Sequence, residues 1–277
     1  MSPLTFNPHT DIAAVSVVII TMNEAQTIAG CIASVSVLTD NIIVVDAESI
    51  DGTAAIAQRC GATVLVQPWS GYGHARNAGA SLARHNWILS IDADERLTAS
   101  LAVAIRQLVT NDAVSRYRFR RTNFFQEKEV RFGTLGNESV TRLYNRLACS
   151  WSLVPVHETL IGRGNTATLR GKIEHYGIGD KHTFLEKKEG YARLSADKYA
   201  TQGKQASLTK LYFAPMFNAV KSFVFQLGFL DGETGWFLAS VTYRYTKQKY
   251  RFLADATKQS HHENPYQAAR IRELSSG

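Results

Sequence analysis

Residues 15–35, VSVVIITMNEAQTIAGCIASV, contain a strand, a turn and a helix that set the pattern for the first third of the chain. Residues 15–20 form an almost unbroken β-branched run, which predicts a strand buried on both faces, as in a parallel sheet. From Glu24 onward, apolar residues recur at spacings of three and four, which is typical of one buried face of a helix. These residues are Ile28, Cys31, Ile32, Val35 and Leu38. The stretch therefore predicts one strand–helix repeat of an α/β fold.

The same alternation continues to residue 92. Further buried strands are predicted at residues 41–45, 62–67 and 87–92, with helices at residues 51–61 and 73–84 between them. Alternating strands and helices predict a doubly wound α/β sheet. The sequence has no G-x-G-x-x-G after the first strand and no G-x-x-x-x-G-K-[ST], which disfavours dinucleotide binding.

Beyond residue 98 the pattern changes. A helix is expected near residues 99–110, and residues 115–125 alternate basic and aromatic side chains, which predicts a strand with one basic and one buried face. The alternating residues are Arg116, Tyr117, Arg118, Phe119 and Arg120. Residues 130–176 are expected to be irregular, with short strands, and to contain an acceptor-binding region.

The C-terminal third differs in composition from the rest. Residues 183–202 predict a helix, and residues 211–230 and 235–253 are apolar and aromatic with interspersed Lys and Arg. We therefore expect an α/β domain over residues 1–180 and a mostly helical, apolar and basic extension over residues 181–277.

Charge and cysteine content narrow the class of protein. The net charge is +7 and the isoelectric point is near 9.3, which favours an anionic partner such as a nucleotide, a phosphorylated glycolipid or an acidic membrane surface. Only the positive charge would support nucleic-acid binding, so we expect no nucleic-acid partner. The three cysteines, Cys31, Cys60 and Cys149, suggest neither a disulfide framework nor a zinc site. Residues 1–11 do not resemble a signal peptide, and no run of about eighteen apolar residues occurs, so a cytoplasmic location is expected.

Two carboxylates, Asp92 and Asp94, follow the strand predicted at residues 87–92. Doubly wound sheets bind ligands at the carboxyl ends of their strands. Polar residues also follow the first and second strands, namely Thr21, Asn23, Glu24 and Asp46. A pair of carboxylates at such an edge could hold Mg²⁺ or Mn²⁺ together with phosphate oxygens. The alternative interpretation is a helix-capping turn.

Four motifs in the first hundred residues resemble the family 2 inverting glycosyltransferases, whose catalytic domain is called GT-A. They are VSVVIITMNEAQTIAGCIASV, IIVVDAESIDGTAAIA, GYGHARNAGASLA and WILSIDADERL. The downstream motifs RLYNR, VHETL, IEHY and GFLDGETGW are similar to the bacterial branch with lipopolysaccharide core β-1,4-glucosyltransferases. The resemblance implies a Rossmann-like GT-A domain with a nucleotide-sugar half at residues 13–100 and an acceptor half at residues 101–180.

The resemblance also implies roles for donor-binding residues. Asp46 would accept a hydrogen bond from uracil, with the backbone near Thr21, Met22 and Glu24 forming the base pocket. Asn23 would also bind the nucleotide-sugar, and Arg76 would face the nucleotide or its diphosphate. The predicted ligands of a divalent Mn²⁺ or Mg²⁺ are Asp94, Asp92 and His175, and Asp92 would also approach the ribose. The donor is therefore expected to be a UDP-sugar, with UDP-glucose as the leading candidate.

The general base implied by the resemblance is Glu158, a carboxylate that could take the proton of the attacking hydroxyl, with His157 beside it. Glu138 is a second candidate. Arg142 and Arg146 are expected to help bind an anionic acceptor, such as phosphorylated lipopolysaccharide inner core. The Q-x-x-R-W signature of processive members is absent, which implies the addition of a single sugar.

Several alternatives stay open at this stage. The acceptor could instead be another glycan or a polyprenyl phosphate, and the chain could be a catalytically silent nucleotide-sugar-binding module. The C-terminal helices could lie on the inner leaflet of the bacterial inner membrane, which would make the protein peripheral there, or could form a buried hairpin on the sheet.

Overall fold

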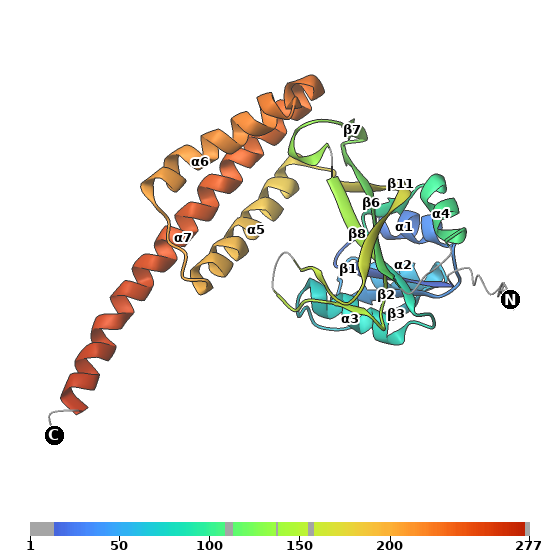
Figure 1. Cartoon of the computed structure of the whole chain (residues 1–277), viewed down its shortest axis with the longest axis horizontal. Coiled ribbons are helices and arrows are strands. Elements are labelled where there is room, and N and C mark those ends of the chain that lie inside the picture. Colours follow the sequence, from blue (N-terminus) through green and yellow to red (C-terminus); the bar gives the residue numbers. More distant parts are fainter. Residues whose placement is uncertain (1–13, 109–112, 137, 155–157, 275–277) are drawn as a thin grey trace, which may run out of the picture. The chain divides into compact units, whose positions relative to one another are not determined.

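The structure is a computed structural model that describes residues 14–108, 113–136, 138–154 and 158–274 (Figure 1). The chain divides into two compact units. Unit 1 comprises residues 1–123 and 138–177, and unit 2 comprises residues 124–137 and 178–277. The sequence prediction put its boundary near residue 180. The segment 124–137, expected in the acceptor half, belongs to unit 2.

Unit 1 is built around a mixed sheet with strand order β3-β2-β1-β4-β8-β6-β11-β5. β1, β2, β3 and β4 are parallel, and β8 then pairs antiparallel with both β4 and β6. The strands are β1 (Val15–Thr21), β2 (Ile42–Asp46), β3 (Thr63–Val66), β4 (Trp87–Asp92), β5 (Glu95–Leu97), β6 (Val114–Phe125), β8 (Glu138–Asn145) and β11 (Asn165–Ile178). A separate antiparallel pair consists of β9 (Cys149–Trp151) and β10 (Leu160–Gly162).

Helices cover both faces of the parallel strands, as the continuous apolar run of residues 15–20 predicts. Alternate residues of β1 point to opposite faces: Val17 and Ile19 pack with α1 and α4, whereas Val18 and Ile20 pack with α3. The helices of this unit are α1 (Ile28–Val35), α2 (Thr53–Arg59), α3 (Tyr72–Leu82) and α4 (Ala99–Arg106). The predicted doubly wound α/β fold is therefore confirmed.

Two helix boundaries and the structure of one segment differ from the prediction. α1 begins at Ile28 rather than near Glu24, and α4 ends at Arg106. Residues 130–176, predicted to be irregular, include an eight-residue strand β8 and a fourteen-residue strand β11. Both strands pair within the main sheet, so backbone hydrogen bonding to neighbours distant in sequence stabilises them.

Unit 2 is mainly helical, as expected for the C-terminal extension. Helices α5 and α6 both pack along α7 (Figure 1). The elements are β7 (Lys128–Val130), η1 (Gly133–Leu135), α5 (Lys181–Thr201), α6 (Leu208–Val220), η2 (Lys221–Phe225), η3 (Gly228–Asp231) and α7 (Gly232–Leu274). Its core joins Phe125 and Val130 to Phe184, Leu238 and Val241. The segment 124–137 therefore supplies part of this unit's own core.

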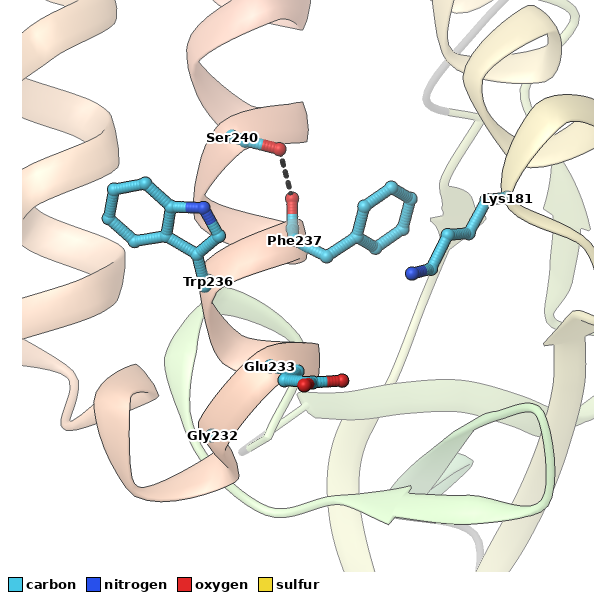
Figure 2. A pocket seen from close by; sticks show the side chains of 6 residues that line it. All are labelled: Lys181, Gly232, Glu233, Trp236, Phe237 and Ser240. Carbon is cyan, nitrogen blue, oxygen red and sulfur yellow. Dashed lines mark hydrogen bonds between the residues drawn. The ribbon is translucent and has the colours of Figure 1, made fainter.

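Among the described helices, none taken singly has the length and apolar composition to cross a membrane. The pair formed by residues 208–225 and 228–257 passes by length and composition only, with a bend of 72° between its halves. Unit 2 also has an open hollow of about 560 Å³ beside the start of α7 (Figure 2). Its lining is Lys181, Gly232, Glu233, Trp236, Phe237 and Ser240.

Candidate active site

The polar residues that follow β1, β2 and β4 lie at one edge of the parallel sheet. The register sets Thr21 opposite Asp46 and Ile20 opposite Asp92. Asp46 is 1% exposed, and its Oδ1 accepts a hydrogen bond from the backbone N–H of Ser49 at 2.8 Å. Within the described chain, Asp46 Oδ2 and Thr21 Oγ1 are buried without a hydrogen-bond partner. Two buried polar atoms are thus available to a ligand at this edge.

Asn23 and Glu24 join the turn after β1 to the turn after β2. Asn23 has a φ of 55° and accepts a hydrogen bond from the backbone of Ile50 at 3.0 Å. The backbone N–H of Glu24 donates to Thr53 Oγ1 at 2.9 Å. The Glu24 carboxylate accepts from the Thr27 hydroxyl at 2.8 Å. These contacts fix the shape of the loops that border Asp46.

Asp92 is held between two arginines. Arg76 Nη2 donates to its Oδ1 at 2.6 Å, and Arg142 Nη2 donates to its Oδ2 at 2.7 Å. Arg76 is 1% exposed, also donates to Ser90 Oγ at 2.7 Å, and lies 4.8 Å from the Trp151 ring. Burial by itself raises the pKa of Asp92, but Arg142 and Arg76 outweigh it and hold that pKa well below its usual range. Asp92 is therefore ionised, and both of its oxygens are engaged by guanidinium groups.

Glu95, the third carboxylate of the DADE stretch, is fully buried and organises the turn. Its Oε2 accepts from the backbone N–H of Asp92 at 2.9 Å. Its Oε1 lies 3.3 Å from Arg121 Nη1 and 3.4 Å from Arg142 Nη2. Glu95 thus compensates the charge of two buried arginines and fixes the backbone that carries Asp92.

Asp94 faces His175, which is carried by β11. His175 Nε2 lies 3.4 Å from Asp94 Oδ2, while its Nδ1 is 2.7 Å from Asn123 Oδ1. Asn123 Nδ2 donates to Glu138 Oε2 at 3.2 Å, so Asn123 Oδ1 is the atom that faces the imidazole. Nδ1 must therefore carry a proton and donate it to Asn123. Nε2 is left to hold either a second proton or a cation shared with Asp94.

Three observations test whether this pair suits a divalent cation. Asp94 Oδ1 is buried and has no hydrogen-bond partner among the described residues. A Cβ built on Gly177 would lie 2.5 Å from His175 Nε2 and 2.7 Å from Asp94 Oδ2, so the glycine keeps this space open. Within the described part of the chain, no group of three or more His, Cys, Asp or Glu side chains could hold a metal ion. The residues fit a cation with two protein ligands, completed by phosphate oxygens and water.

The proton on His175 is stabilised by its surroundings. Burial lowers the pKa of His175, but the charge of Asp94 and a hydrogen bond to it outweigh burial, so the pKa lies above its ordinary value. Arg121 completes the chain of contacts because its Nη2 pairs with Glu138 Oε2 at 2.8 Å. One network of polar contacts therefore runs from Arg76 through Asp92, Glu95, Arg121 and Glu138 to His175.

The residues predicted to act as the general base and to bind the acceptor differ in their contacts. Glu158 has a 15% exposed side chain, and its Oε1 lies 3.6 Å from Arg76 Nε, which brings it to the Asp92 cluster. His157 lies outside the described residues. Arg142, expected at the acceptor, is 7% exposed and bound to Asp92. Arg146 donates to the carbonyl oxygens of Ala80 and Ala83 at 2.6 and 2.8 Å, so it caps the end of α3.

Sequence reasoning missed Arg121 and Asn123 and weighed Glu138 only as a base. The alternation in β6 could have found the first two, because Tyr117, Phe119, Arg121 and Asn123 share the face opposite Arg118. Polar residues that continue a buried face are a signal for a polar network.

Residues 16–157 match the family described as glycosyl transferase family 2. The chain belongs to this family and is a glycosyltransferase. It is 30% identical to an uncharacterized glycosyltransferase of Rickettsia prowazekii over 247 residues, which is 84% of each chain. It is 28% identical over 256 residues to the lipopolysaccharide core biosynthesis glycosyltransferase LpsC of Rhizobium meliloti, covering 86% of this chain and 94% of that one.

Among solved structures, mannosyl-3-phosphoglycerate synthase of Rubrobacter xylanophilus superposes with a TM-score of 0.47 at 21% identity. The superposition covers 71% of this chain and 77% of that one. The family assignment is therefore carried by the sequence matches and by the α/β sheet described above.

Proposed function

We propose that this glycosyltransferase transfers a single sugar, with glucose from UDP-glucose as the leading donor, to a lipopolysaccharide inner-core acceptor with inversion. We also propose that it uses Mn²⁺ or Mg²⁺. The observation that carries the proposal is the pairing of Asp94 with His175 next to the arginine-bound Asp92, at the carboxyl edge of the parallel strands.

The donor site proposed here combines three features. The free Oδ2 of Asp46 would accept a hydrogen bond from the uracil N–H, and Thr21 would border the base. Asn23 and Glu24 would shape the pocket through their backbone and turn contacts. Arg76 and Asp92 would lie near the ribose and diphosphate, with the guanidinium already oriented by Ser90.

The proposed cation ligands are Asp94 and His175. Asp92 lies beside them but is not proposed as a direct ligand, because both of its carboxylate oxygens bind arginine. When bound, the cation would neutralise charge on the departing diphosphate, which is worth several kcal/mol in a transition state. Asn123 holds the His175 proton on Nδ1, which leaves the Nε2 lone pair for the ion.

Glu158 is the proposed general base. Its carboxylate is near the Asp92 cluster through Arg76, and a carboxylate within hydrogen-bond reach of an attacking hydroxyl typically contributes about 10²- to 10⁴-fold to the rate. His157 is proposed to assist it. Inversion follows from a single displacement, in which the acceptor oxygen bonds to the anomeric carbon as the diphosphate leaves.

The acceptor assignment is supported by the name of the Rhizobium meliloti relative and by the basic composition of the chain. A cytoplasmic location, peripheral on the inner face of the inner membrane, would bring the enzyme to a lipid-anchored acceptor. The alternative acceptors are another glycan or a polyprenyl phosphate.

The test is a donor screen that measures UDP release with truncated core oligosaccharide, with Mn²⁺ or Mg²⁺ and again with chelator. We expect release with UDP-glucose and its loss with chelator, and a Glu158→Gln variant that binds UDP but turns over about 10²- to 10⁴-fold more slowly. Metal-independent transfer would overturn the role of Asp94 and His175. UDP release that does not depend on the core oligosaccharide would overturn the proposed acceptor.

A further inference from the structure

Helix α6 does not show the amphipathic pattern usual for a surface helix, because several of its exposed residues are large and apolar. The most buried residues of α6 and η2 are Pro215 and Ser222, the latter 3% exposed. Asn218 Nδ2 donates to Thr246 Oγ1 of α7 at 3.3 Å, and Leu211 and Phe223 are half-buried. Ordinarily the apolar stripe of a helix faces the core and the polar stripe faces solvent.

The outward face carries large apolar side chains. On α6 they form two adjacent pairs, at residues 212–213 and 216–217, that are four residues apart, and Leu208 lies four residues before the first pair. One further exposed aromatic residue, Phe225, lies on η2. This surface, called the α6 stripe below, consists of Leu208, Tyr212, Phe213, Met216, Phe217 and Phe225. Phe213 is 72% exposed and Phe225 is 74% exposed. A contiguous stripe of this kind marks a surface that is covered by something else.

The apolar surface continues near the start of α7, at Trp236. The Trp236 ring lies 5.5 Å from the Phe223 ring and is 67% exposed. Figure 2 shows Trp236 on the opposite side of α7 from Phe237, whose ring faces Lys181. Tryptophan and tyrosine are the aromatic residues enriched at membrane–water interfaces.

Charge identifies the kind of partner. Between Thr201 and Leu230 the sequence has three lysines, Lys204, Lys210 and Lys221, and no Asp or Glu. The lysines of this segment suit an anionic bilayer, because they can reach lipid phosphates while the stripe enters the acyl boundary. The nearest acidic residues, Asp231 and Glu233, lie beyond the segment, on η3 and at the start of α7. Interfaces between protein chains, in contrast, are depleted in lysine.

The bend before α7 and the basic residues on α7 argue against a membrane-crossing helix here. α7 turns by 72° from the preceding segment and soon carries Arg244, Lys247, Lys249 and Arg251, which are costly inside a bilayer. We therefore propose that α6 and η2 lie in the plane of an anionic membrane surface, with the α6 stripe as the lipid-binding face. The proposal extends the peripheral location proposed above, but it is tested without any sugar substrate.

The experiment is vesicle flotation with the full chain, using phosphatidylcholine vesicles with and without phosphatidylglycerol. We expect the wild-type chain to float with the anionic vesicles, and a Phe213→Glu, Phe217→Glu double variant to bind at least about tenfold more weakly. The matched control is Leu82→Glu with Val103→Glu, which changes two comparably exposed apolar residues, at 51% and 52%, of unit 1 and should bind as wild type.

Three outcomes would overturn the proposal: a wild-type chain that stays with the protein fraction, a double variant that floats as well as wild type, and a control that loses binding equally. A wild-type dimer in sedimentation that the double variant dissociates, without vesicle binding, would identify a second copy as the partner. If the double variant fails to fold by circular dichroism, Tyr212→Asp provides the same test. Loss of sugar transfer with vesicle binding intact would count against the proposed function alone.

Discussion

Unit 1 buries charged side chains, and unit 2 exposes large apolar ones. Both units depart from the usual distribution, in which charged residues are exposed and large apolar residues are buried, but the two departures are compensated in different ways. In unit 1, Arg76 and Glu95 are 1% and 0% exposed, and every buried charge of the network has an opposite charge within the same unit. In unit 2, Phe213 on α6 and Phe225 on η2 are more than two-thirds exposed, whereas Pro215 and Ser222 are buried. The charges of unit 1 are compensated internally, whereas the α6 stripe requires an external partner.

The comparison distinguishes two kinds of functional signal. Buried ion pairs cost desolvation energy that their attraction offsets only with good geometry, so a protein gains little stability from keeping them. Exposed apolar stripes cost solubility. Each feature is therefore better explained by what it binds than by stability, and the following variants test that explanation, beginning with the largest expected effect.

Asp94→Asn should reduce sugar transfer by about 10³-fold, because it removes the carboxylate that would share the cation with His175. Turnover and Mn²⁺ affinity, the latter by calorimetry in the presence of UDP, measure the effect. Asp40→Asn is the control, since Asp40 is 80% exposed and pairs only with the surface Arg84 among the described salt bridges. Equal loss in both variants would mean that Asp94 has no special role.

Glu95→Gln should lower the free energy of unfolding by about 3 kcal/mol, because it leaves Arg142 and Arg121 without one buried counter-charge. Urea denaturation gives the value. The exposed pair of Asp40 and Arg84 should contribute less than about 1 kcal/mol in the same assay. If Glu95→Gln lowered the free energy of unfolding by less than about 1 kcal/mol, the buried arginines would not depend on Glu95 as a counter-charge.

Gly177→Ala should weaken Mn²⁺ binding about 5- to 100-fold, because the added methyl group would occupy the space between His175 Nε2 and Asp94 Oδ2. Electron paramagnetic resonance of free Mn²⁺ measures the change. Gly190→Ala on α5 is the control: its added Cβ meets nothing within 4 Å, so the variant should bind Mn²⁺ normally. Unchanged affinity in Gly177→Ala would place the ion elsewhere.

Glu138→Gln should have the smallest effect, a loss of at most about 1 kcal/mol that depends on pH. Burial raises the pKa of Glu138, but Arg121 and the hydrogen bonds from Arg121 and Asn123 outweigh it, so the folded pKa lies below the ordinary 4.5. A depressed carboxyl pKa stabilises the fold above the unfolded pKa, and the contribution is lost as pH falls through the folded value.

The wild type and Glu138→Gln should therefore differ in unfolding free energy near neutral pH, and the difference should shrink as the pH falls below the ordinary pKa of 4.5. Urea titrations across that range provide the comparison. A gap that widens in acid would reverse the assigned sign.

Much of the fold and part of the site could be predicted from particular residues. The run Val15–Ile20 predicts a strand covered on both faces, and its two alternating faces pack into two separate clusters. Asp92 and Asp94 were identifiable from their position at a strand end. Arg121 and Asn123 were missed because the basic alternation of Arg116, Arg118 and Arg120 drew attention to the exposed face of β6. β11 was missed because its stability depends on pairing with strands distant in sequence.

The sequence by itself determined the order of strands and helices over residues 15–92, the edge at which the acidic residues lie, and membership of the glycosyltransferase family, because apolar periodicity and short motifs are local properties. Only the tertiary structure decided which charges meet. Arg76 and Arg142 lie 16 and 50 residues from Asp92 in the chain, and their contacts depend on helix docking and on the register of β4 with β8. The structure alone also decided that α6 buries Pro215 and leaves Phe213 exposed, because the direction of a helix face is set by the helices it packs against.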